Sequence, residues 1–210
     1  MHNPDTYFIS SAVDYYVAGR YAVFAGLNPT AGNLLHHAVE MCLKAGLAKK
    51  GKSLAELKRL NHRLPDIWNQ FKTHFPGHSL GAFDSLIGEL HRFEEIRYPD
   101  SIVSKGMLCA IDPGKRPQVS QSPSARTEPQ YALYLGEIDE LMVKLFSVAS
   151  FSLPAFFGRL MPTAKSYLHE RNEVYPGGTV LPNIPEQRHW LAPVAIWGAL
   201  RRRLRTFVRV

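Results

Sequence analysis

Apolar side chains recur with helical spacing along most of the first hundred residues. Between residues 5 and 25 they return every three or four positions, which predicts a first helix. Asn28-Pro29 then places a capping residue before a proline, a pattern typical of a helix start. We therefore predict a second helix that begins there and ends at Gly46 or Gly51.

Two further helical stretches follow before residue 96. The sequence Ser53-Leu54-Ala55-Glu56 matches a capping box, in which the first and last side chains cap each other's backbone N–H groups. We expect the stretch to break near Asn61-His62 and to restart, because Pro65 is tolerated only near a helix start. Its inward aromatic residues would be Trp68, Phe71 and Phe75.

Ser79 is the predicted cap of a fourth helix. The apolar residues of that helix are Leu80, Phe83, Ile87, Leu90 and Phe93. Four helices joined by short loops favour an antiparallel bundle over residues 1–100. The predicted fold class is therefore all-α.

The pattern changes in residues 101–136, which we interpret as an irregular segment. Two short apolar runs, residues 107–111 and 131–135, flank a stretch rich in Pro, Ser and Gln. The two runs predict a small β-hairpin, and residues 113–129 between them predict a long mobile loop.

Helical spacing returns in the C-terminal part of the chain. It predicts one helix over residues 137–150, another over 155–171 and a last helix that ends in a run of arginines. We expect these C-terminal helices of residues 137–210 to pack on the bundle.

Composition limits the class of protein. Of 210 residues, 45% are hydrophobic, yet the longest apolar runs fall short of the roughly 20 residues that span a bilayer. The N-terminus lacks the basic and then apolar pattern of a signal peptide. Cys42 and Cys109 both lie among apolar neighbours, which is typical of buried, reduced thiols. We predict a soluble, cytoplasmic protein without a transmembrane segment.

The net charge of +7 belongs mainly to the C-terminal end. Five arginines in the last ten residues contribute five of the seven charges, which leaves +2 for residues 1–200. A helix over residues 190–209 would carry apolar residues on one face and arginines along its flank. Three interpretations stay open: a docked terminal helix with solvated arginines, contact with nucleic-acid phosphates, or contact with an anionic membrane surface. The nucleic-acid-binding candidates are Arg201, Arg202, Arg205 and Arg209.

Four short motifs in the first hundred residues carry a resemblance to a known family. They are YYVAGRYA at residues 15–22, HHAVEMCLKA at 36–45, LNHRLPDI at 60–67 and RYPD at 97–100. Together they resemble the HEPN domain, named for higher eukaryotes and prokaryotes nucleotide-binding. The resemblance implies a bundle of four or five helices that is often dimeric, which allows a homodimer here. Many members cut RNA or accompany nucleotidyltransferases in defence systems.

The chain departs from the family's ribonuclease motif. Ribonuclease members place a histidine four to six residues after an arginine, which supplies a cation for phosphate and a group for proton transfer. No arginine of this sequence has a histidine at that spacing. We therefore predict no catalytic residues and a non-catalytic module that binds a nucleotide, RNA or protein partner, of the kind that regulates a defence or toxin–antitoxin pair. The alternative is a ribonuclease with an atypical active site.

The resemblance also suggests a ligand site. Arg20, His62 and Arg97 would form a phosphate-recognising cluster at one end of the bundle. A structural interpretation is enough to explain Arg97, because an arginine in the last turn of a helix interacts favourably with the helix dipole.

Two histidine–carboxylate pairs raise the question of a metal. His37 and Glu40 are three residues apart on a predicted helix, and so are His91 and Glu94. Known di-iron bundles use the reverse order, Glu-x-x-His, and add glutamates from two further helices. We therefore predict structural histidines, with no bound metal and no cofactor.

Overall fold

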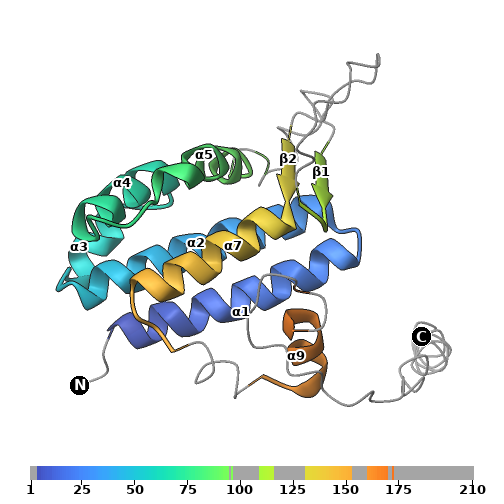
Figure 1. Ribbon diagram of the computed structural model, residues 1–210, viewed down its shortest axis with the longest axis horizontal. Helices are drawn as coiled ribbons and strands as arrows, with labels where there is room; N and C mark the ends of the chain where they lie inside the picture. The colour runs from blue at the N-terminus through green and yellow to red at the C-terminus, as the bar shows by residue number, and fades with distance from the viewer. Residues whose placement is uncertain are drawn as a thin grey trace, which may run out of the picture. The chain divides into compact units, whose positions relative to one another are not determined.

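The computed structural model of the chain describes residues 4–94, 96, 109–115, 131–152, 160–169 and 172. Helices dominate these residues, and the two longest, α1 (Pro4–Phe24) and α2 (Asn28–Lys49), run antiparallel side by side (Figure 1). The shorter helices α3 (Leu54–Arg59), α4 (Leu64–His74) and α5 (Asp84–Arg92) follow. The all-α prediction is thus confirmed in outline, with one small sheet as the exception.

The tight connection between α1 and α2 follows from local sequence. Gly26 adopts a left-handed backbone conformation with φ of 73°, which only glycine reaches without strain. The N–H of Leu27 then donates to the carbonyl of Ala22, closing the end of α1 at 2.9 Å. Asn28 and Pro29 begin α2 at once, as the sequence predicted.

The predicted end of α2 at Gly46 is wrong, and the alternative at Gly51 is right. Gly46 lies inside α2, where a Cβ atom would approach the ring of Phe71 to 2.5 Å. This glycine therefore serves close packing rather than helix termination. Gly51, with φ of 92°, follows the end of α2 at Lys49.

The capping box and the predicted break after α3 are both confirmed. Ser53 and Glu56 cap each other, with the Ser53 N–H donating to Glu56 Oε2 at 2.8 Å. Asn61 takes a positive φ of 47° in the turn before α4. The predicted inward residues Trp68, Phe71 and Phe75 are buried.

The predicted cap at Ser79 is wrong. A short 3₁₀ turn, η1 (Gly81–Phe83), comes first, and α5 begins only at Asp84. Asp84 accepts hydrogen bonds from Trp68 Nε1 at 2.6 Å and Lys72 Nζ at 2.7 Å on α4. The start of α5 is therefore fixed by this contact with α4, which local sequence does not show.

The two predicted strands pair, but they do not form a hairpin. β1 (Cys109–Asp112) runs parallel to β2 (Tyr131–Tyr134), and a parallel pair needs a long connection, here residues 113–130. Of the predicted mobile loop, residues 113–115 lie against the next helix, where the N–H of Gly136 donates to the carbonyl of Gly114 at 3.0 Å. Residues 116–129 lie outside the described part of the chain.

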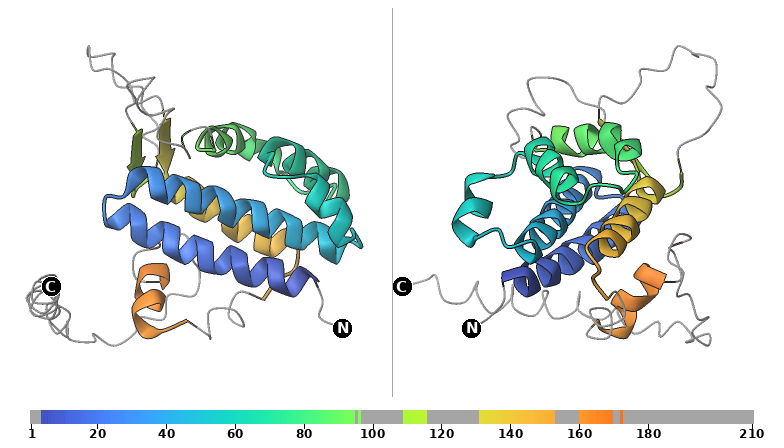
Figure 2. Two further views of the ribbon diagram at one scale, coloured as in Figure 1. Left: turned by 180° about the vertical axis from the view of Figure 1, so that it is seen from behind. Right: turned by 60° about the vertical axis from the view of Figure 1, so that its left-hand side comes forward.

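Two later helices pack on the α1–α2 pair. α7 (Leu135–Val148) buries its apolar face in the same hydrophobic core as α1, α2, α4 and α5. α9 (Pro162–His169) contacts α1, on the side of the pair away from α4 and α5 (Figure 2). The predicted last helix and its arginines lie outside the described residues.

The structure bears on two predictions, the lack of a transmembrane segment and the burial of the two cysteines. Within the described residues, every helix is too short or too polar to cross a bilayer. Cys42 is a buried thiol, as the sequence predicted, whereas Cys109 is only partly buried.

Gly32 provides a stability prediction. A Cβ at this buried position of α2 would overlap the ring of Phe93, which is itself fully buried. We expect Gly32→Ala to lower the free energy of unfolding by about 1–3 kcal/mol, as overpacking of a core typically does. Gly88→Ala is the matched control, because its Cβ would enter open space on α5 and should stabilise by up to about 1 kcal/mol. Urea denaturation of both variants would measure the two effects, and equal effects would contradict the packing argument.

Candidate functional site

Arg20 lies at the centre of a buried polar network. Its guanidinium pairs with the carboxylate of Asp139 on α7, and its Nε donates to the carbonyl of Tyr167 on α9 at 3.0 Å. Tyr16 also donates its hydroxyl to Asp139 and accepts a hydrogen bond from Asn172 Nδ2 at 3.1 Å. The Arg20 network, defined by these five residues, therefore joins α1, α7 and α9.

The electrostatics of the Arg20 network are those of a structural crosslink. Burial, with the nearby Asp139 charge, raises the pKa of Tyr16 well above its usual value, so the tyrosine is a neutral donor. Burial also raises the pKa of Asp139, while the adjacent Arg20 guanidinium opposes that rise. Because the side chain of Arg20 is completely buried, it offers no surface to a ligand from solvent.

A second polar network surrounds Glu40 on α2. The Nδ1 atoms of His62 and His37 lie 3.0 and 3.3 Å from Glu40 Oε2. Lys44 Nζ donates to Glu40 Oε1 and to the carbonyl of Asn61, each at 2.7 Å. We call His37, Glu40, Lys44 and His62 the Glu40 cluster. It connects α2 to the turn between α3 and α4.

Glu40 is ionised although its side chain is fully buried. Burial by itself raises the pKa of a carboxyl group, but hydrogen bonds from His37, Lys44 and His62 lower the pKa of Glu40 to about 2. The cluster reaches solvent at its histidines, because the side chain of His62 is 50% exposed and that of His37 19%.

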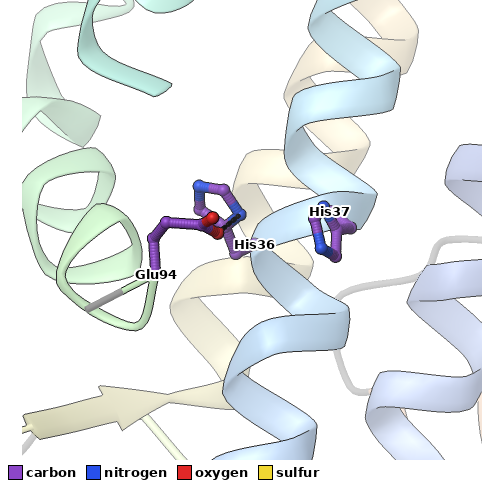
Figure 3. Close-up of side chains that lie close together, drawn as sticks. All are labelled: His36, His37 and Glu94. Atoms are coloured by element: carbon purple, nitrogen blue, oxygen red, sulfur yellow. Dashed lines mark ion pairs between the residues drawn. The ribbon is translucent and has the colours of Figure 1, made fainter. Parts of the chain in front are cut away.

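His36 and Glu94 form a separate pair on the other side of α2. Figure 3 shows the two side chains facing each other, while the neighbouring His37 points away from them. The distance from His36 Nδ1 to Glu94 Oε2 is 3.7 Å, and neither ring nitrogen of His36 makes a hydrogen bond with the described residues. Burial lowers the pKa of His36 from 6.5 to about 4, so this histidine is neutral at pH 7.

The structure places two of the predicted phosphate-binding residues, Arg20 and His62, in different polar networks. Arg20 pairs with Asp139 in the Arg20 network, whereas His62 lies beside Glu40 in the Glu40 cluster. Arg97 lies outside the described residues, as do the four candidate arginines of the C-terminal end. A ligand-binding role for these residues stays a prediction.

Sequence reasoning missed the buried partners of both networks. Asp139 appeared only as a polar position of a predicted helix, and nothing in the local sequence marks it as the partner of Arg20. For Glu40 the sequence showed the spacing to His37 and to Lys44 on the same helix, which is equally typical of exposed pairs, but not the contact with His62.

An apolar groove lies on the described surface. It has a volume of about 580 Å³ and lies between α1, the start of α2 and α9. The apolar residues that define it here are Val17, Ala18, Tyr21, Leu34, Met161 and Tyr167. Among the described residues that line the groove there is no basic side chain, and Asp14 is the only charged one.

The rim of the groove exposes large apolar side chains. The exposed fractions of Met161 and Tyr21 are 75% and 53%, and that of Leu27 is 52%. Isolated exposed apolar residues are ordinary on proteins, whereas a group of them around a concave surface marks an interaction site.

Comparison with known proteins gives no match to a family model, a curated protein or a solved structure.

Proposed function

We propose that the chain is a non-catalytic binding module, built on an HEPN-like bundle, that holds a protein partner in the α1–α2–α9 groove. The observation that carries this proposal is the groove itself, an accessible apolar surface whose rim exposes Met161, Tyr21 and Leu27. The resemblance to HEPN domains supports the bundle and suggests a regulator of a defence or toxin–antitoxin pair.

The chemistry of the groove favours a protein over a nucleotide or RNA. Phosphate groups are bound by arginine, lysine and backbone N–H groups, and the described lining has no basic side chain. Its carboxylate, Asp14, would repel a phosphate. An amphipathic helix that inserts aliphatic or aromatic side chains suits the walls, and a lysine or arginine beside them would pair with Asp14.

The burial of Arg20 and His36 supports a non-catalytic role. Arg20 and Asp139 neutralise each other in the interior, and His36 is buried and neutral. Arg20 and His36 therefore do not provide an accessible arginine–histidine pair for RNA cleavage. Nucleic-acid binding is a second candidate, carried by the five arginines of the last ten residues rather than by the groove.

Site-specific photo-crosslinking tests the proposal. A photoreactive amino acid in place of the exposed Ala18 should give one discrete adduct in cells that express the protein at its natural level. The same substitution at the exposed Ser85 on α5 is the control and should not give that adduct.

Whether the adduct contains protein or nucleic acid decides between the two candidate partners. An adduct that protease removes and nuclease leaves intact would support a protein partner, a second copy of the chain included. Nuclease-sensitive adducts from Ala18, or identical adducts from Ala18 and Ser85, would contradict the proposal.

A further inference from the structure

The Glu40 cluster places three metal-ligating atoms together. His37, Glu40 and His62 each offer one ligand atom, and these three atoms lie within 4.8 Å of one another. The Nδ1 atoms of both histidines lie next to Glu40 Oε2. The sequence analysis paired His37 with Glu40 and predicted no metal, because the order and number of ligands differ from those of di-iron bundles. The turn between α3 and α4 adds His62 as the third ligand.

The separations between these atoms suit a single transition-metal ion. Two ligand atoms, each about 2.0–2.1 Å from a tetrahedral zinc, lie roughly 3.3 Å apart. Glu40 Oε2 is 3.3 Å from His37 Nδ1 and 3.0 Å from His62 Nδ1. The two imidazole rings are 5.6 Å apart and inclined by 78°, so both rings can direct a nitrogen to one point.

The surroundings hold the carboxylate in one orientation. Lys44 bonds Glu40 Oε1 and the carbonyl of Asn61, which leaves Oε2 for an ion and fixes the turn that carries His62. The ammonium group also weakens binding of any cation. The site therefore selects an ion with a strong preference for imidazole nitrogen over one that depends on carboxylate charge.

We infer that His37, Glu40 and His62 form a binding site for a divalent transition metal of the zinc type. Two imidazoles and one carboxylate supply three ligands, and the exposed side of His62 leaves access for the ion and a water molecule. His36, His37 and Glu94 also lie close together, but they suit an ion less well, because His36 is completely buried and its Nδ1 lies 3.7 Å from Glu94 Oε2.

Titration of the untagged protein with Zn²⁺, followed by calorimetry, tests this inference. We expect one equivalent to bind to the wild-type protein. His62→Ala, at an exposed position that should fold normally, is expected to weaken binding by at least about tenfold, and His37→Ala likewise. His78→Ala is the control, an exposed histidine outside the cluster that should leave affinity unchanged.

Cobalt provides a second measurement. Co²⁺ bound at the cluster should show the visible absorption of a low-coordinate ion with nitrogen ligands, and Zn²⁺ should displace it. The inference is overturned if the wild-type protein binds no stoichiometric metal, or if His62→Ala binds Zn²⁺ as tightly as the wild type.

Discussion

Replacing Asp139 with alanine is expected to lower the free energy of unfolding by about 3–5 kcal/mol. The substitution leaves Arg20 as a buried charge without its carboxylate, and it removes the acceptor of the Tyr16 hydroxyl. A domain of this size has a total stability of about 5–15 kcal/mol, so the variant should unfold at much lower urea concentration. Equilibrium urea denaturation followed by circular dichroism would measure the change.

Two controls separate the buried charge from the loss of a side chain. Arg20→Met combined with Asp139→Leu removes both charges and should recover most of the stability, because apolar residues replace the pair. Arg63→Ala breaks an exposed ion pair, in which the side chain of Arg63 is 72% exposed and that of Asp66 47%. Its loss should lower the free energy of unfolding by less than about 1 kcal/mol. If Asp139→Ala costs no more than Arg63→Ala, the Arg20 network is not a principal crosslink of the fold.

Acid should destabilise the protein in two successive pH ranges. The pKa of His36 is about 4 in the folded protein and 6.5 when exposed, so the unfolded chain binds more protons between these values. Stability should therefore fall as the pH drops from about 6.5 to 4. Each unit of difference between the folded and unfolded pKa of His36 corresponds to 1.36 kcal/mol. The free energy of unfolding should therefore fall by roughly 3 kcal/mol over this range.

Glu40 acts at lower pH with the same sign. Its pKa is about 2 in the folded protein and 4.5 when exposed, so its contribution, also roughly 3 kcal/mol, is lost as the pH falls from about 4.5 to 2. In the His36→Leu variant, stability should depend less on pH between about 6.5 and 4. Between about 4.5 and 2 it should depend on pH as it does in the wild type. The groups that surround His36 are Glu40, His37, Glu94 and His91, and they are unchanged in this variant.

Denaturation at a series of pH values checks the account of His36. A wild-type stability that is constant between pH 6.5 and 4.5, or a His36→Leu variant with the same pH dependence as the wild type, would contradict it.

Features that depend on neighbouring residues could be predicted from the sequence. Helical spacing located α1, α2 and α7, and the capping box at Ser53 located the start of α3, because these signals act within one or two turns. The break at Asn61 followed from the position of Pro65 by the same local reasoning.

Features that depend on distant contacts could not be predicted. Parallel rather than antiparallel pairing of β1 with β2 is decided by how the chain crosses between them, not by the strands' composition. Arg20 looks like a ligand residue in sequence because its partner, Asp139, is 119 positions away. His62 became a candidate metal ligand only when the turn before α4 was placed beside α2.

The most direct test of the central claim is the affinity of the partner, identified by crosslinking from Ala18, for wild-type protein and for Ala18→Arg. Ala18 is exposed on α1, so the substitution should leave the fold intact and place a charge among the apolar walls of the groove. We expect affinity to fall by about thirtyfold or more, the loss typical of a central interface residue. Ser85→Arg should bind as the wild type does. Equal affinity of wild type and Ala18→Arg would contradict the assignment of the groove as the partner-binding site.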